Sequence, residues 1–248
     1  MSAVATTVGT FVWHEQVSPD PAQAQQFYSE LFGWETEVFK PGDADYTMIA
    51  SGGRMHGGFG MAMEGAPPPH WLGHVRVDGL EDAIERAQAA GGTVAASPFE
   101  MSEVGHVAIV RDPAGAFVSL YEPNGDQPRA EGVFVWDELN VPDADVAQPF
   151  YEQVFGWSTV DAGPEYGGYR LFQIGENRVA GLMGFPDAAP HWRPYVAVAD
   201  VDDRTAVAKD LGATVLLEPT DVPMVGRLAV LSDPQGATFG IITQGPPA

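Results

Sequence analysis

The sequence predicts an α+β protein made of two tandem copies of one domain. The segment Phe27–Trp34 returns 123 positions later as Phe150–Trp157, and Asp112–Ala116 returns 121 positions later as Asp233–Ala237. Both copies also show the same order of predicted strands and helices. A repeat unit this long is a duplicated domain rather than a solenoid unit, so we expect each copy to bury its own core.

The first half of each copy is predicted to hold a strand, a helix and short strands. Residues 11–17 have the pattern of a strand, and Asp20–Pro21 is typical of a helix start. Gly33 ends this helix. In the second copy Pro149 must lie near the first turn of the equivalent helix, because proline disrupts a helix interior. The apolar stripe of the first helix is Ala24, Phe27, Tyr28 and Leu31, and short strands follow around residues 47–51 and 55–61.

The second half of each copy repeats the order of strand, helix and strands. In the first copy, residues 71–77 are predicted to form a strand and residues 81–90 a helix. Two further strands, at residues 107–111 and 116–121, meet at Asp112–Gly115. That tetrapeptide has Asp first, Pro second and Gly fourth, which suits a type I turn.

Composition limits the classes of partner and chemistry. The 248 residues include 34 acidic and 12 basic side chains, and the net charge of −22 disfavours nucleic acid and anionic membranes. Zero cysteines exclude disulfides, thiol nucleophiles and thiolate metal ligands. No apolar run is long enough to span a bilayer, and Met1–Val4 lacks the basic stretch of an export signal. We therefore expect a cytoplasmic protein with neither nucleic acid nor membrane partners.

The motifs resemble the vicinal oxygen chelate superfamily, also called glyoxalase/bleomycin-resistance/dioxygenase proteins. The resemblance rests on Phe27–Trp34, on Gly73-His74-Val75 and on Asp112–Gly115, within a duplicated chain. It implies two tandem glyoxalase-like domains, each made of paired βαβββ modules whose sheets curl around a cleft. The domains span residues 9–122 and 132–243, with residues 123–131 as linker.

A second resemblance is to the tandem glyoxalase-like proteins of actinobacteria that are often labelled hydroxylases. It rests on Val225–Val230 with Asp233–Gly236. Some of those relatives serve as accessory proteins in antibiotic pathways, including anthracycline pathways.

The superfamily resemblance also implies four metal-ligand positions for each cleft. In copy one these are Trp13, a position near His56, His74 and Ser119; in copy two they are Trp136, roughly Val179, Tyr195 and Gly240. A catalytic zinc normally needs three protein ligands and an open position, and neither copy supplies three. We therefore expect no metal and no other cofactor, although His56 and His74 could share a weakly held ion. His14 should face the opposite side of its strand, and His70 and His191 are expected to be structural.

Aromatic and acidic residues stand where metal ligands are missing. Trp13 and Trp136 occupy the same place in the two copies, and each is followed two residues later by a carboxylate, Glu15 or Glu138, on the same strand face. A planar, partly cationic ligand would stack on the indole and pair with the acid. The alternative is that the tryptophans fill an abandoned pocket and the acids pair with Arg76 or Arg193. The candidate ligand-binding residues are Trp13, Glu15, His56, Leu72, His74, Arg76, Phe117, Ser119, Tyr121, Trp136, Glu138, Asn140, Arg193, Tyr195 and Thr238.

Two classes of function follow. In the first, the protein binds a small aromatic natural product without a metal, for antibiotic sequestration or as an accessory protein in antibiotic biosynthesis. In the second it is a lyase, isomerase or oxygenase that uses Glu15 and His74 as catalytic acid and base, or a recruited divalent metal. No nucleophile elbow, phosphate loop or dinucleotide fingerprint supports another enzyme class. Because tandem copies can pair within one chain, we expect a monomer or a weak homodimer.

Overall fold

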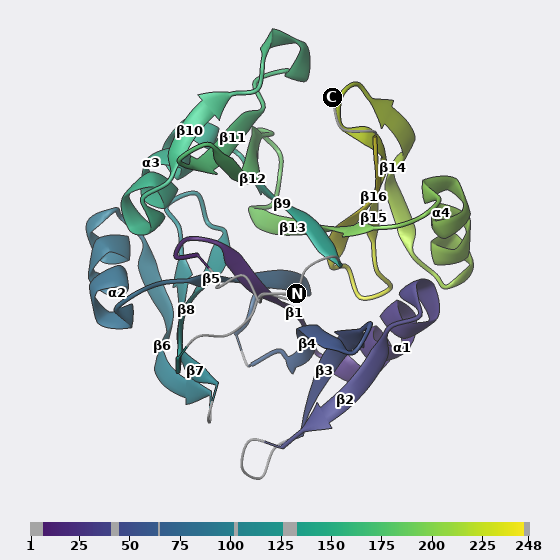
Figure 1. Ribbon diagram of the computed structural model, residues 1–248, viewed down its shortest axis with the longest axis horizontal. Helices are drawn as coiled ribbons and strands as arrows, with labels where there is room; N and C mark the ends of the chain where they lie inside the picture. Colours follow the sequence, from purple (N-terminus) through teal and green to yellow (C-terminus); the bar gives the residue numbers. More distant parts are fainter. Residues whose placement is uncertain (1–6, 41–44, 64, 102–103, 126–132, 246–248) are drawn as a thin grey trace. The chain divides into compact units, whose positions relative to one another are not determined.

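The computed structural model describes residues 7–40, 45–63, 65–101, 104–125 and 133–245 (Figure 1). Two mixed sheets of eight strands, each with its helices, confirm the predicted α+β fold and the duplication. The linker predicted at residues 123–131 lies mostly outside the described residues, and the domain boundaries stay predictions. Within the described residues, no helix is long and apolar enough to cross a membrane.

The two sheets have the same strand order. The first sheet runs β2-β3-β4-β1-β5-β8-β7-β6, and the second runs β10-β11-β12-β9-β13-β16-β15-β14. Copy one consists of β1 (Phe11–Ser18), α1 (Pro21–Phe32), β2 (Glu35–Phe39), β3 (Tyr46–Ser51), β4 (Arg54–Met61), β5 (His70–Arg76), α2 (Leu80–Ala89), β6 (Thr93–Met101), β7 (Gly105–Arg111) and β8 (Phe117–Pro123). Copy two consists of β9 (Phe134–Val141), α3 (Ala144–Phe155), β10 (Ser158–Asp161), the 3-10 turn η1 (Pro164–Tyr166), β11 (Arg170–Ile174), β12 (Asn177–Gly184), β13 (His191–Ala197), α4 (Val201–Asp210), β14 (Thr214–Val222), β15 (Gly226–Ser232) and β16 (Thr238–Gln244).

The first helices of the two copies begin and end in matching ways. The Asp20 side chain accepts a hydrogen bond from the Gln23 amide, and α1 ends at Gly33 with φ at 69°. In α3 the Asp143 carboxylate caps the helix, so Pro149 lies inside it and beyond the first turn. The expectation that Pro149 sits near the first turn was therefore wrong. The cap and the buried apolar stripe of α3 outweigh the one hydrogen bond that proline removes.

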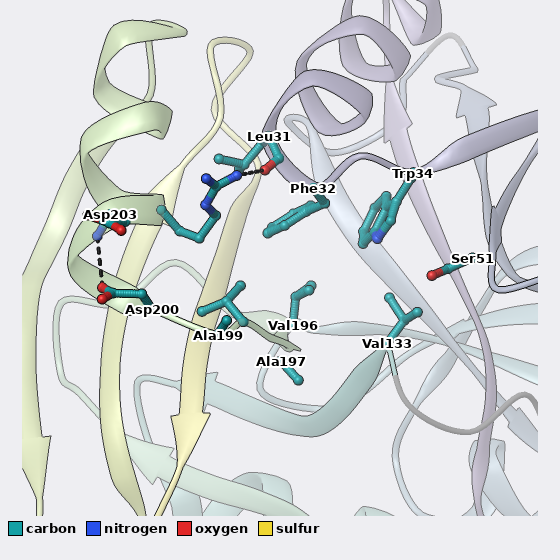
Figure 2. A pocket seen from close by; sticks show the side chains of 12 residues that line it. Leu31, Phe32, Trp34, Ser51, Val133, Val196, Ala197, Ala199, Asp200 and Asp203 are labelled. Atoms are coloured by element: carbon teal, nitrogen blue, oxygen red, sulfur yellow. Dashed lines mark hydrogen bonds between the residues drawn. The ribbon is translucent and has the colours of Figure 1, made fainter.

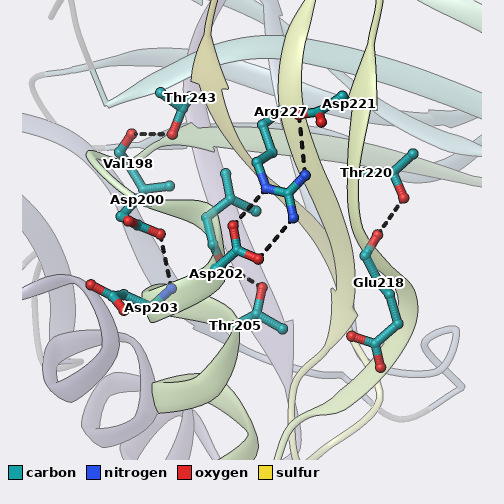
Figure 3. Close-up of polar contacts among 11 residues, drawn as sticks. Val198, Asp200, Asp202, Asp203, Thr205, Glu218, Thr220, Asp221, Arg227 and Thr243 are labelled. Carbon is teal, nitrogen blue, oxygen red and sulfur yellow. Dashed lines mark hydrogen bonds and ion pairs between the residues drawn. The ribbon is translucent and has the colours of Figure 1, made fainter.

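Helix α4 is fixed at its start by carboxylates, as Figure 3 shows. Asp200 accepts a hydrogen bond from the Asp203 amide at 3.0 Å and so caps the helix. Arg227 on β15 forms ion pairs with Asp202 of α4 and Asp221 of β14. One guanidinium group therefore ties the helix to the two-stranded edge of its sheet.

The hydrophobic cores do not follow the repeats. One compact unit combines most of β5–β8 and α2 of copy one with most of β9–β12 and α3 of copy two, while the other combines most of β1–β4 and α1 with most of β13–β16 and α4. The division falls within β1, β5, β9 and β13, so Trp13 belongs to the first unit and Glu15 to the second. Each unit has one core cluster to which both copies contribute. This differs from the expectation that each copy buries its own core. The helices explain the difference, because α2 packs against α3 in the first unit and α1 against α4 in the second.

The repeated motifs build the same buried hydrogen-bond network in each unit. In the first unit the Tyr151 hydroxyl donates to Asp112 Oδ2 at 2.8 Å, and Trp192 Nε1 donates to the Tyr151 oxygen at 3.0 Å. Asp112 Oδ1 accepts from the amides of Gly115 and Ala116, within the predicted type I turn. In the second unit Asp233, Tyr28 and Trp71 repeat these bonds.

These networks give structural roles to three of the duplicated residue types, Asp, Tyr and Trp. Burial raises the pKa of Asp112 and Asp233, and it holds the pKa of both tyrosines well above the ordinary value.

His70 and His191 form hydrogen bonds through Nδ1 with the carbonyls of Pro68 and Ala189, as expected of structural histidines at a strand entrance. Trp71 and Trp192 are buried packing residues, as are Trp34 and Trp157.

Candidate ligand-binding faces

Strand β1 turns its two faces to different environments. His14 stacks on Phe134 with ring centroids 4.1 Å apart, and Gln16 Nε2 donates to Asp233 at 3.2 Å. Both side chains therefore lie on the core side of the strand, and Glu15 lies on the opposite face. This confirms the expectation that His14 lies on the strand face opposite the one that carries Glu15.

Strand β9 repeats this arrangement in copy two. Leu139 and Val141 are fully buried in the core of the first unit. Trp136, Glu138 and Asn140 alternate with them and occupy the other face of the strand. Glu138 is buried, and Trp136 is half-buried. The predicted pairing of an indole and an acid on one strand face is therefore present in the structure.

Glycines face the two acids on the neighbouring parallel strands. Glu15 on β1 is opposite Gly58 on β4, and Glu138 on β9 is opposite Gly181 on β12. The resemblance had placed this ligand position near His56 and Val179, two residues earlier in each copy. His56 lies in β4 with its Nε2 bonded to the carbonyl of Ser51 at 3.2 Å, and burial lowers the pKa of its ring.

Tyrosine hydroxyls cover these glycines in both copies. A Cβ placed on Gly181 would overlap the Tyr169 hydroxyl, and a Cβ on Gly58 would overlap the Tyr46 hydroxyl. Trp136 Nε1 donates a hydrogen bond of 2.9 Å to the Tyr169 oxygen. Sequence analysis did not identify either tyrosine. The repeat could have identified them, because Tyr46 and Tyr169 are 123 positions apart, the same offset as that between Trp13 and Trp136.

Strands β5 and β8 carry the largest group of predicted candidates. The two strands are parallel, with His74 opposite Ser119 and Arg76 opposite Tyr121. The Tyr121 hydroxyl donates to the carbonyl of Val104 at 2.9 Å. Ser119 is fully buried, and its Oγ has no hydrogen-bond partner among the described residues. The full group on these two strands is Leu72, His74, Arg76, Phe117, Ser119 and Tyr121.

The corresponding strands of copy two are filled by their own side chains. Tyr195 on β13 is opposite Gly240 on β16, and a Cβ on Gly240 would overlap the Tyr195 ring. The Arg193 guanidinium lies 5.6 Å from the centre of that ring, a cation–π distance. Thr238 stands at the start of β16. These strands therefore carry an imidazole and a hydroxyl in copy one, where copy two has a phenol ring over a glycine.

The structure thus places the candidate residues in separate groups, each on one strand or on one pair of neighbouring strands. Within the units it brings together Trp136, Glu138 and Asn140 on β9, the group on β5 and β8, and the group on β13 and β16. Glu15 lies with Tyr46, Gly58 and Gly60, and a Cβ on Gly60 would overlap the Glu15 carboxylate. Assembly of the groups into one cleft per copy stays a prediction, as do the ion pairs with Arg76 and Arg193.

A pocket that the sequence did not indicate lies within the second compact unit (Figure 2). Its volume is about 410 Å³. Phe32 and Trp34 line one side with ring centroids 4.7 Å apart, and Val196 lies across from them. Arg204 reaches over from α4 and donates to the carbonyl of Leu31 at 2.9 Å. None of these residues is among the sequence candidates.

A family model described as a glyoxalase-like domain matches the chain twice, over residues 13–120 and 134–242. The chain belongs to the glyoxalase-like family of the vicinal oxygen chelate superfamily. Protein CFP32 of Mycobacterium tuberculosis, which is provisionally named a glyoxylase, is 33% identical to this glyoxalase-like protein over 96% of both chains. The anthracycline biosynthesis protein DnrV of Streptomyces peucetius is 32% identical, over 94% of this chain and 93% of DnrV.

Solved structures confirm the fold of this glyoxalase-like protein. The manganese(II)-bound glyoxalase from Novosphingobium aromaticivorans superposes with a TM-score of 0.67 at 16% identity, covering 95% of this chain and 82% of that one. The 2,3-dioxygenase LapB from Pseudomonas sp. KL28 superposes with a TM-score of 0.65 at 14% identity, covering 99% and 94%.

The residues that face one another on these strand pairs do not fit a catalytic divalent metal. Within the first compact unit, Glu138 faces Gly181, which has no side-chain donor, and His74 faces the neutral hydroxyl of Ser119. Within the second unit, Glu15 faces Gly58 and Tyr195 faces Gly240, so each of these pairs has one residue with a donor. Among the described residues, no three His, Asp or Glu side chains gather as metal ligands. No strand pair therefore supplies the three ligands that a catalytic divalent metal normally takes from the protein.

Proposed function

We propose that this glyoxalase-like protein binds a small planar aromatic molecule without a metal. The observation that carries the proposal is the group formed by an indole and a carboxylate on β9 and the phenol of Tyr169, which precedes β11: Trp136 donates to Tyr169, and Glu138 faces Gly181 on β12. The aromatic groups favour stacking, the acid favours an amine, and the hydroxyl favours an oxygen atom.

The relatives indicate the chemical class of the ligand. DnrV and the DauV protein of Streptomyces sp. strain C5 are both named anthracycline biosynthesis proteins, and both align over more than nine-tenths of this chain. Anthracyclines are planar aromatic compounds with an amino sugar. A net charge of −22 attracts such a cation by long-range electrostatics. We therefore propose an anthracycline-type natural product as ligand, bound for sequestration or for an accessory step in its biosynthesis.

A fluorescence titration tests this proposal. Protein treated with a chelator is titrated with doxorubicin while tryptophan emission is followed, and the titration is repeated with added Mn²⁺. We expect saturable quenching without metal, and Trp13→Ala or Trp136→Ala should weaken binding by about fivefold or more, because each removes a stacking surface. Phe185→Ala, at an exposed aromatic residue outside the candidate groups, is the matched control. Binding that requires Mn²⁺ would contradict the proposal.

The second candidate function is that of an enzyme, and the placement of His74 opposite a buried serine on β5 and β8 favours it. Glu15 or His74 would then exchange a proton with a bound substrate. Substitution separates the two functions: Glu15→Gln and His74→Gln should abolish turnover of a substrate while leaving most of its binding. Turnover that is unchanged in both variants would exclude this pair as catalytic acid and base.

A further inference from the structure

We infer that Ser119 forms a hydrogen bond with a carbonyl or hydroxyl oxygen of the ligand, and that this contact belongs to copy one, because copy two has a glycine at the equivalent position. The inference rests on the proposed binding function and adds to it the residue that recognises an oxygen atom of the ligand. It concerns β5 and β8, which are neighbours in the first sheet (Figure 1) and play no part in the argument for stacking.

The burial of Ser119 is the first argument. Its side chain is fully buried, and its Oγ has no hydrogen-bond partner among the described residues. Ser18 is equally buried, but its Oγ accepts a hydrogen bond from Gln235 Nε2 at 3.3 Å. A buried hydroxyl without a partner costs free energy, so the stability of the fold alone does not favour serine over alanine at position 119. The hydroxyl is explained if its partner comes from a bound molecule.

The strand face that carries Ser119 is the second argument. Val118 and Leu120, its neighbours in sequence, belong to the core of the first unit, so Ser119 lies on the opposite face of β8. Phe117 and Tyr121 flank it there, two residues away on either side. The hydroxyl is therefore a polar group between two aromatic rings, on a face that does not join the core. An aromatic ligand that carries an oxygen atom matches this surface in both respects.

The comparison of the two copies is the third argument. His74 and Ser119 face each other on β5 and β8, and the residues 121 positions later, Tyr195 and Gly240, face each other on β13 and β16. In copy two the Tyr195 ring takes the space where a Cβ of Gly240 would lie. One of the chain's own rings thus covers this position in copy two, whereas copy one keeps a hydroxyl there. The Asp–Tyr–Trp networks, in contrast, are the same in both units.

Two probes separate the hydrogen bond from stacking. Doxorubicin carries quinone, phenol and hydroxyl oxygens, whereas 9-aminoacridine is a planar aromatic cation without oxygen. In calorimetric titration of the metal-free full chain, Ser119→Ala should weaken doxorubicin binding by about threefold to tenfold, the usual effect of losing a hydrogen bond. Binding of 9-aminoacridine should change by less than about twofold, because the aromatic surfaces remain. Equal losses for the two probes would overturn the inference.

The matched control is a second buried hydroxyl that lies outside the candidate groups. Thr159 on β10 also has a buried Oγ1 without a hydrogen-bond partner among the described residues. Thr159→Val removes this hydroxyl at nearly constant volume and should leave the affinity for both probes unchanged. A loss of doxorubicin binding equal to that of Ser119→Ala would show that the effect is not specific to Ser119, and would overturn the inference.

Urea unfolding of the ligand-free protein separates ligand binding from a structural role. Because the Ser119 hydroxyl has no partner in the chain, Ser119→Ala should leave the urea midpoint unchanged or raise it, even though it weakens doxorubicin binding. A clear fall in the midpoint would show that the hydroxyl serves the fold, and would overturn the inference.

A second variant converts the pair of copy one into that of copy two. In His74→Tyr combined with Ser119→Gly, a ring should cover a glycine, as Tyr195 covers Gly240. Doxorubicin binding should fall at least as much as in Ser119→Ala, since the hydroxyl is lost and its place is filled. Unchanged doxorubicin affinity in this variant and in Ser119→Ala would overturn the inference and leave binding itself established. Failure of the wild-type protein to bind either probe would overturn the proposed function, and this inference with it.

Discussion

At the scale of single residues, the duplicated polar groups divide into those that join the cores and those that lie on the opposite strand faces. Tyr28, Trp71 and Asp233 form a buried chain of hydrogen bonds in which every donor has an acceptor. Tyr169 and Trp136 form a similar bond on a half-buried strand face. The two Tyr–Trp hydrogen bonds differ in how deeply their side chains are buried, and a sequence motif alone does not reveal this difference.

The buried tyrosines should contribute measurably to stability. Tyr28→Phe leaves the indole N–H of Trp71 without an acceptor and removes one donor from Asp233, so we expect a loss of about 1–3 kcal/mol in the free energy of unfolding. Tyr151→Phe should have a similar effect through Trp192 and Asp112. Urea unfolding measures both changes, with Phe185→Leu, at an exposed aromatic residue, as the control. A loss below about 0.5 kcal/mol for both variants would show that the networks do not stabilise the fold.

Asp233 should make stability depend on pH in a defined direction. Burial raises its pKa above the ordinary value of 3.8, so the folded protein holds this proton to a higher pH than the unfolded chain. Its contribution to stability is therefore full below about pH 3.8 and is lost as the pH rises through the folded pKa. Asp233→Asn cannot titrate and keeps one acceptor for the turn amides. Relative to this variant, the wild-type protein should lose stability in urea unfolding as the pH rises from 3.5 to 7, and a relative gain would contradict the assignment.

At the scale of elements, sequence patterns predicted strands and helices well where caps and turns have a local cause. Asp20 and Gly33 bound α1 as expected, and Asp112–Gly115 forms the expected turn. The start of α3 was less predictable, because a capping aspartate and an internal proline give conflicting local signals and tertiary packing decides between them. Tyr46 and Tyr169 were missed because which residue faces Gly58 or Gly181 depends on strand pairing, and the sequence does not reveal pairing.

The N-terminus of helix α2 is capped by a side chain from a strand and not by its own N-cap residue. Its N-cap residue, Gly79, has no side chain, and Glu122 at the end of β8 accepts from the amides of Gly79 and Leu80 at 2.9 and 3.3 Å. Glu122→Ala should therefore lower the free energy of unfolding by about 1 kcal/mol, as loss of a cap usually does. Thermal or urea unfolding measures the change. Glu85→Ala, which removes an exposed carboxylate from the same helix, is the control, and an equal effect of the two would exclude capping by Glu122.

At the scale of the whole molecule, the division of the cores is the feature that sequence analysis did not anticipate. The repeat predicted two domains correctly as sequence units, and the family model matches each of them. It did not predict that β1–β4 share a core with β13–β16, or that β5–β8 share one with β9–β12. Periodicity shows that α2 has an apolar face, but the identity of its partner, α3, is a tertiary contact.

This division predicts that neither copy is stable alone. A fragment of residues 1–125 contains β1–β4 without β13–β16 and β5–β8 without β9–β12, so both of its helices present apolar faces that the intact chain buries. Burial of apolar surface is the dominant favourable term in folding, and each fragment loses a large part of it. We expect residues 1–125 and 133–248 to be unfolded or self-associated when expressed separately, and to form a folded one-to-one complex when mixed. Circular dichroism and light scattering distinguish these states. A monomeric fragment with a cooperative unfolding transition would show that a single copy has a sufficient core of its own.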